Sequence, residues 1–128
     1  MNGLATGLVG SARWVVEERH LATHWRSGVV PVFATPSLVA LMEVAAVDAL
    51  EGRLPPGDTT VGTRIDIAHL AATPLGEEVR ALARLVEVDG RRLVFDVEAH
   101  DGARKVGEGR HERTVVARNR FLEKLGRR

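Results

Sequence analysis

The 128-residue sequence contains no cysteine. That absence excludes disulfide frameworks, zinc sites with cysteine ligands, iron–sulfur clusters and catalysis by a thiol. Eighteen Lys and Arg residues oppose 17 Asp and Glu residues, so the formal net charge is only +1 and the chain is not a polybasic partner of nucleic acid. No window approaches the roughly 20 apolar residues of a membrane span, and the first ten residues lack the basic region of a secretory signal. We therefore expect one soluble cytoplasmic domain over residues 1–128, with no membrane partner.

Several short motifs of known chemistry are also absent from the sequence. It has no P-loop, no GxGxxG, no HExxH and no GxSxG pattern. His69, His100 and His111 lack the helical or tight-turn spacing of a metal site, so we expect no metal and no cofactor. The basic residues after Ala117 lack the interleaved aromatic pattern of single-strand binders, and we expect them to form a short solvated helix.

Residues 35–52 are the only long candidate helix. Thr35 suits the N-cap, Pro36 suits the first helical position, and Gly52 suits the C-terminal exit. The middle of the segment is apolar at nearly every position, so the helix has no polar face. We expect such a helix to be surrounded by other structure.

The sequence after residue 57 is β-type in character. Asp89-Gly90 and Asp101-Gly102 predict hairpin turns, and apolar and polar residues alternate clearly over 92–99. We therefore predict an α+β fold, in which an antiparallel sheet of about five strands carries one buried helix. The predicted strands are 11–18, 59–70, 77–88, 91–100 and 105–116.

Glu43 is the one charged residue in the middle of the apolar helix. Positions 39 and 47 are both Val, so no basic side chain one helical turn away offers a partner. A carboxylate in such a place needs a partner, shifts toward its neutral form, or borders a polar cavity. Two interpretations stay open: a glutamate that reaches solvent or a neighbouring backbone, and a functional carboxylate.

His69 and Thr35 are further candidates for chemistry. Alternation places His69 on the same face as Ile65 and Ile67, where a histidine is most often a satisfied core residue. Near Glu43, however, an imidazole could share general acid–base work with the carboxylate. Thr35 is either a simple cap or part of a helix N-terminus that stabilises an oxyanion or a phosphate.

Two positions in the predicted sheet also stand out. Gly62 lies within a strand, where a missing side chain weakens packing unless a backbone or a ligand comes close. Arg113 shares a strand face with Gly107, Gly109 and His111. Its guanidinium faces either a phosphate or solvent, and the sequence leaves both readings open.

Seven short motifs resemble the hotdog-fold thioesterases typified by fluoroacetyl-CoA thioesterase. The likeness runs from about Val32 to Val116, and a Thr, a Glu and a His are separated by the family's eight and then 26 residues. The motifs are Phe-Ala-Thr-Pro at 33–36, Leu-Met-Glu at 41–43, Val-Gly-Thr at 61–63, His-Leu-Ala at 69–71, Val-Asp-Gly-Arg-Arg-Leu at 88–93, Ala-His-Asp-Gly at 99–102 and His-Glu-Arg at 111–113.

The resemblance implies a hotdog fold, in which a curved antiparallel sheet wraps one long helix. It also implies a homodimer, with a tetramer as an alternative, and active sites at the interface between subunits. Carried over residue by residue, the catalytic groups are Thr35, Glu43 and His69, and acyl-CoA contacts fall on Gly62 and Arg113. The implied activity is hydrolysis of a small acyl-CoA thioester to the free acid and CoA.

The segment before the helix departs from the family pattern. Val29 and Val30 stand where the family has an aromatic lid, so we expect a generic small-acyl-CoA hydrolase rather than one selective for fluoroacetyl groups. Two alternatives keep the hotdog fold: an acyl-CoA hydratase or dehydratase, and a non-catalytic acyl-CoA-binding module. Nucleic-acid binding through the C-terminal arginines is the least favoured alternative.

Overall fold

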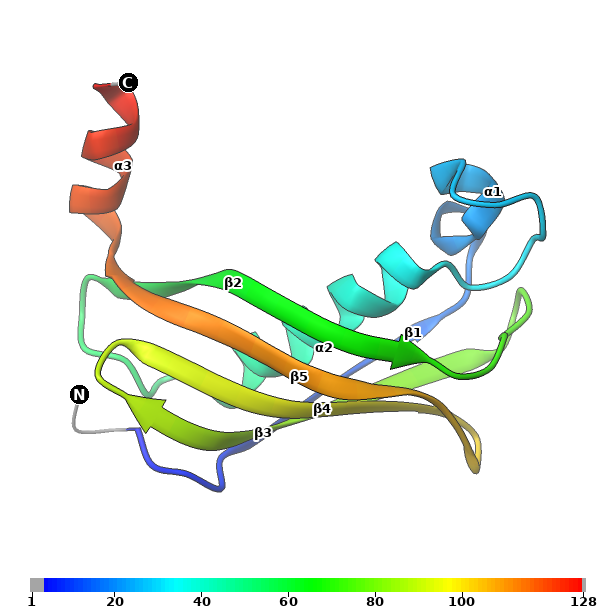
Figure 1. Cartoon of the computed structure of the whole chain (residues 1–128), viewed down its shortest axis with the longest axis horizontal. Helices are drawn as coiled ribbons and strands as arrows, with labels where there is room; N and C mark the ends of the chain where they lie inside the picture. Colours follow the sequence, from blue (N-terminus) through cyan, green and yellow to red (C-terminus); the bar gives the residue numbers. More distant parts are fainter. Residues whose placement is uncertain (1–3, 128) are drawn as a thin grey trace.

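The computed structural model describes residues 4–127, and within them an antiparallel five-stranded sheet packs against one long helix. In Figure 1 helix α2 (Thr35–Ala49) lies behind the sheet, and α1 and α3 lie at opposite ends of the molecule. The strand order is β1-β3-β4-β5-β2, so β1 and β2 form the two edges. This arrangement confirms the predicted α+β class. The strands are β1 (Val9–Val15), β2 (Asp58–His69), β3 (Glu78–Asp89), β4 (Arg92–Asp101) and β5 (Arg104–Ala117).

The strands after residue 57 agree with prediction to within one residue at each end. Gly90 and Gly102 both have positive φ, 60° and 57°, in the predicted β3–β4 and β4–β5 turns. The first strand was predicted at 11–18 but spans Val9–Val15, because the chain turns into a short 3₁₀ helix, η1 (Glu18–His20).

Helix α2 begins and ends differently from the prediction. Thr35 is the first helical residue and not the N-cap, since Ala34 takes the extended N-cap conformation with φ −76° and ψ 150°. The Thr35 hydroxyl is instead directed to another side chain, described below. The helix ends at Ala49 rather than at 52, and Gly52, with φ +73°, lies in the turn that follows.

Helix α2 is covered on one side only in the single chain. Leu38, Leu41 and Met42 are fully buried in the core between α2 and the sheet. On the other side Val44 and Val47 remain 44% and 49% exposed. The expectation that the helix is surrounded therefore holds for its sheet-facing side, and its second side is left open.

Two smaller features complete the described chain. The predicted solvated C-terminal helix is confirmed as α3 (Arg118–Gly126), which buries no residue; Arg128 lies outside the described residues. Between β1 and α2 the chain forms η1 and the short helix α1 (Ala22–Trp25). Across residues 4–127, none of the helices has the length and apolar character needed to cross a membrane.

The closest contact between sheet and helix generates a stability prediction. A Cβ added at Gly10 of β1 would fall on the Ala45 carbonyl oxygen and 2.8 Å from Ala49 Cα, both backbone atoms of α2. We expect Gly10→Ala to lower the free energy of unfolding by about 2 kcal/mol or more, because the helix must move away from the sheet. Urea unfolding at equilibrium measures this change.

The matched control for Gly10→Ala is Gly126→Ala in α3. No heavy atom lies within 4 Å of a Cβ built at Gly126. This substitution should leave the urea midpoint unchanged or raise it slightly, since Ala favours a helix over Gly by up to about 1 kcal/mol. Equal midpoints for Gly10→Ala and the wild type would show that the helix–sheet contact is not tight.

Candidate active site

The start of α2 and the end of β2 bring Thr35 and His69 together. Thr35 Oγ1 lies 2.8 Å from His69 Nδ1, a hydrogen-bond distance, although the residues are 34 positions apart in the sequence. They border a surface pocket of about 410 Å³, whose other walls are small or apolar. The remaining lining residues are Ala22, Ser27, Val32, Phe33, Ala34, Leu70, Ala71 and Ala72.

His69 is held in its neutral form. Burial lowers the pKa of its imidazole, and the nearby Ala71 backbone opposes this shift. Its Nε2 atom is buried and has no hydrogen-bond partner within residues 4–127. A neutral imidazole with one nitrogen on Thr35 and the other unengaged is suited to accept or donate a proton.

Hydrogen bonds hold the segment between β1 and α2 against the first turn of α2. The indole Nε1 of Trp25 donates a 2.9 Å hydrogen bond to Ser37 Oγ, and the Ser37 hydroxyl donates in turn to the His20 carbonyl oxygen at 2.9 Å. Val29 and Val30 are exposed at the tip of this segment and do not line the pocket. The wall of the pocket is therefore set by the fastened part of the segment.

Glu43 belongs to a second cluster, farther along α2. Its Oε2 atom lies 3.5 Å from NH1 of Arg113 on β5. A Cβ at Gly62 of β2 would lie 2.5 Å from the same oxygen. The missing side chain at Gly62 thus makes room for the carboxylate, and Arg113 provides the partner that a charge on an apolar helix requires.

Arg113 is almost fully enclosed, with a side chain only 8% exposed. Its Nε donates to Thr60 Oγ1 at 2.9 Å, its NH2 donates to the Thr60 carbonyl oxygen at 3.3 Å, and its NH1 donates to His111 Nε2 at 3.1 Å. Burial lowers the pKa of the guanidinium, and Glu43 opposes that shift. Within the single chain the guanidinium therefore faces protein groups and not solvent.

The sequence did not identify Thr60 and His111 as parts of this cluster. The one available signal for His111 was its place on the same strand face as Arg113. Nothing in the local pattern distinguishes Thr60 from its neighbour Thr59. The contact requires the β2–β5 pairing, which lies outside local sequence rules.

One chain does not unite all five predicted residues. Thr35 and His69 meet at the start of α2, whereas Glu43, Gly62 and Arg113 meet near its middle. Thr35 and Glu43 are eight residues apart on α2, which corresponds to about 12 Å along the helix axis.

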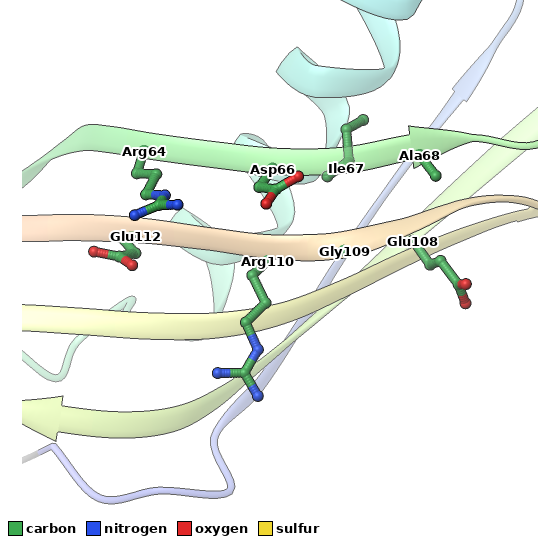
Figure 2. A pocket seen from close by; sticks show the side chains of 8 residues that line it. All are labelled: Arg64, Asp66, Ile67, Ala68, Glu108, Gly109, Arg110 and Glu112. Atoms are coloured by element: carbon green, nitrogen blue, oxygen red, sulfur yellow. The ribbon is translucent and has the colours of Figure 1, made fainter.

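A second hollow lies on the outer face of the sheet. Figure 2 shows acidic and basic side chains interspersed along β2 and β5 there, including Arg64, Asp66 and Arg110. Arg110 pairs with Asp96 at 3.1 Å. Charges of both signs are mixed in this hollow, and none of the predicted site residues lines it. No group of three or more His, Asp or Glu residues that could hold a metal occurs over residues 4–127.

The curved antiparallel sheet packed against one central helix defines a hotdog-fold protein. The model of the fluoroacetyl-CoA-specific thioesterase family matches residues 16–119. A fluoroacetyl-CoA thioesterase from Streptantibioticus cattleyicolor is 47% identical over 94 residues, 73% of this chain and 68% of that protein. The chain therefore belongs to the fluoroacetyl-CoA-specific thioesterase family, and it is a thioester hydrolase.

Solved structures confirm the hotdog fold. A structure of fluoroacetyl-CoA thioesterase is similar with a TM-score of 0.91 and 37% identity, covering 98% of this chain and 97% of the other. A thioesterase superfamily member from Thermus thermophilus has a TM-score of 0.91 and 27% identity over 99% and 94% of the two chains. A hot-dog-like protein from Thermanaerovibrio acidaminovorans has a TM-score of 0.89 and 25% identity over 98% and 93%.

Three histidines whose pKa is lowered by burial make stability depend on pH. Burial is the largest cause that lowers the pKa of His20, His69 and His111 below 6.5. A pKa lowered by folding means that the unfolded chain binds protons more readily, so stability is present above pH 6.5 and is lost as the pH falls. We expect the urea midpoint to drop between about pH 7.5 and about pH 5.5.

The variant His20→Asn tests the origin of this pH dependence. His20 Nδ1 accepts a hydrogen bond from the Glu17 backbone N–H at 2.9 Å, and an Asn oxygen can replace that acceptor without titrating. The variant should lose less stability than the wild type over the same pH interval. A wild-type urea midpoint that rises as the pH falls would contradict the lowered pKa values of the histidines.

Proposed function

We propose that the chain hydrolyses a small acyl-CoA thioester to the free acid and CoA, with Thr35, Glu43 and His69 as catalytic groups. The observation that carries the proposal is the 2.8 Å contact between Thr35 and His69 at the start of α2, beside a small and largely apolar pocket. The family to which the chain belongs supports the same reaction class.

Thr35 and His69 act on the thioester carbonyl and the leaving group. The first turn of α2 has N–H groups without helical partners and the positive end of the helix dipole, which favour an oxyanion on the carbonyl carbon. The neutral imidazole of His69 couples its proton to the reacting groups while Thr35 holds the ring in place.

Glu43 supplies the attack by one of two routes that give the same products. In the first, the carboxylate takes a proton from water, the water oxygen bonds to the carbonyl carbon, and the C–S bond breaks to release CoA after protonation of its sulfur. In the second, a carboxylate oxygen itself displaces the CoA sulfur, and water then hydrolyses the acyl–glutamyl anhydride. Its position beside Gly62 and Arg113 suits either route.

Gly62 and Arg113 contact the substrate near its reacting end. Gly62 is exposed next to the Glu43 carboxylate, so a thioester can approach its backbone closely. Arg113 is enclosed and already donates to Thr60 and His111. An arginine so covered fits the acyl or pantetheine portion better than the charged phosphates of CoA.

The pocket beside Thr35 favours a small acyl group without selectivity for fluorine. Fluoroacetyl-CoA is the substrate in the names of the similar proteins. In this chain Val29 is 92% exposed and Val30 is also exposed, so neither covers the pocket as an aromatic lid would.

The active unit in this proposal is a homodimer. Strand β2 is a 12-residue edge with no neighbour on its outer side within the described residues, and an edge of that length pairs readily with a second copy. Such pairing would also cover Val44 and Val47. It would bring Glu43 of one chain to the Thr35–His69 pair of the other, which the 12 Å helical separation prevents within one chain.

The first test is thiol release from a panel of acyl-CoAs, from acetyl and fluoroacetyl to medium chains. Glu43→Gln and His69→Ala should each lower kcat/KM by about 10²-fold or more, because each removes a group that moves a proton or forms a bond. Glu78→Gln, a change of the same kind at an exposed position on β3, should behave as the wild type.

Other outcomes of the panel separate the competing functions. Hydration of an enoyl-CoA without release of thiol would indicate a hydratase. Binding of CoA esters without turnover would indicate a binding module. Full activity of Glu43→Gln would remove the glutamate from the mechanism.

Complementation tests the shared site. Inactive Glu43→Gln and His69→Ala chains, unfolded and refolded together at equal amounts, should regain about one quarter of wild-type activity, since half of the dimers are mixed and each has one intact site. If all three groups came from the same chain, every site would stay defective and no activity would return.

A further inference from the structure

His111 occupies the centre of the Glu43 cluster. It is 1% exposed, on the face of β5 that looks toward α2. The Phe95 ring stacks near it with centroids 6.3 Å apart, and a Cβ at Gly62 would lie 3.3 Å from His111 Cε1. Phe95 therefore packs against the ring, and a side chain at position 62 would crowd its Cε1 atom.

Hydrogen-bond chemistry assigns the proton of His111. Nδ1 lies 2.8 Å from the carbonyl oxygen of Arg64, which only accepts, so Nδ1 carries hydrogen. Nε2 lies 3.1 Å from NH1 of Arg113, which only donates, so Nε2 carries none. The two contacts together require a neutral imidazole with its proton on Nδ1.

An irregularity in β2 lies beside this acceptor. The β2–β5 register shifts between Gly62 and Arg64, so Thr63 has no residue opposite it in the β5 register. The Arg64 carbonyl, which accepts the hydrogen bond from His111 Nδ1, directly follows this bulge. Bulges that redirect a strand are frequent next to active sites.

We propose that His111 is a positioning residue: by accepting one NH1 hydrogen of Arg113, it aims the guanidinium at Glu43 and so fixes the carboxylate for catalysis. The inference rests on the proposed role of Glu43. Thr60 holds the Nε and NH2 side of the guanidinium, and His111 and Glu43 share the NH1 side. Because the guanidinium is planar and rigid, Thr60 and His111 hold it from opposite ends, and its NH1 stays 3.5 Å from Glu43 Oε2.

The surroundings of His111 favour its neutral form. The charged groups that face it are Arg113 on β5 and Glu43 on α2, and Glu112 acts on it from the opposite face of β5. Burial lowers its pKa most, and Arg113 lowers it further, against the opposite effects of the Arg64 carbonyl and the two glutamates. Protonation would place an Nε2 hydrogen against the NH1 donor and break the contact.

Two amide substitutions at His111 distinguish its contact with Arg113 from its contact with the Arg64 carbonyl. In His111→Gln the amide oxygen can take the place of Nε2 and accept from Arg113, whereas in His111→Asn the shorter amide can reach the Arg64 carbonyl but not Arg113. With the preferred acyl-CoA, we expect His111→Asn to lower kcat by about 10²-fold with little change in KM, because a carboxylate misplaced by about 1 Å loses that much rate. His111→Gln should recover most of the loss.

Val79→Ala is the structural control. It removes buried volume from β3, where residue 79 pairs with Trp14 of β1 and not with a member of the cluster. It should lower the urea midpoint while leaving kcat per folded molecule unchanged. The midpoints of all variants identify the folded fraction used in each assay.

A double variant shows whether His111 acts through Arg113. In an Arg113→Met background, His111→Asn should cost little more, since the two residues serve one contact. A full additional loss there, equal kcat losses for Asn and Gln, or wild-type kcat for His111→Asn would each overturn the proposal. If Glu43→Gln itself retains activity, the proposed function fails instead, and the two failures are thereby distinguished.

Discussion

The close packing of α2 on the inner face of the sheet is the contact on which the other features depend. Gly10 in β1 and Gly107 in β5 lie where the helix approaches most closely; a Cβ at Gly107 would be 2.7 Å from Leu38. Because these two positions have no side chains, α2 packs close to the sheet, and its contacts with β1 and β5 fix its position. The same packing that buries the apolar side therefore places Thr35 at the end of β2 and Glu43 beside β5.

The Thr35–His69 pair and the Glu43–Arg113 cluster differ in their electrostatic surroundings. Thr35 and His69 lie by an apolar pocket, and burial keeps the imidazole uncharged. Glu43, with a side chain 41% exposed, meets a guanidinium that is itself enclosed and needs an anion. A buried arginine needs hydrogen-bond acceptors for its N–H groups. The neutral imidazole of His111 supplies one of these acceptors to Arg113.

Much of the fold could be predicted because its signals are local. Asp-Gly turns mark the ends of β3, β4 and β5, and alternation identifies their faces, so these boundaries agree to within one residue. The ends of α2 and β1 were less predictable. An apolar run does not show where a helix stops, and the hydroxyl of Thr35 is equally suited to capping a helix and to bonding a distant histidine.

The sequence by itself determined the α+β class, the residue types of the site and their spacing along α2, β2 and β5, because periodicity and turn chemistry depend on neighbours in the chain. Only the tertiary structure decided which of these residues meet. The Thr35–His69 contact spans 34 positions and the Arg113–Thr60 contact 53, and both depend on helix placement and on strand register. It was the β2–β5 pairing, with its shift at Thr63, that enclosed Arg113 with Glu43 and His111, since hydrogen bonds and desolvation act through space.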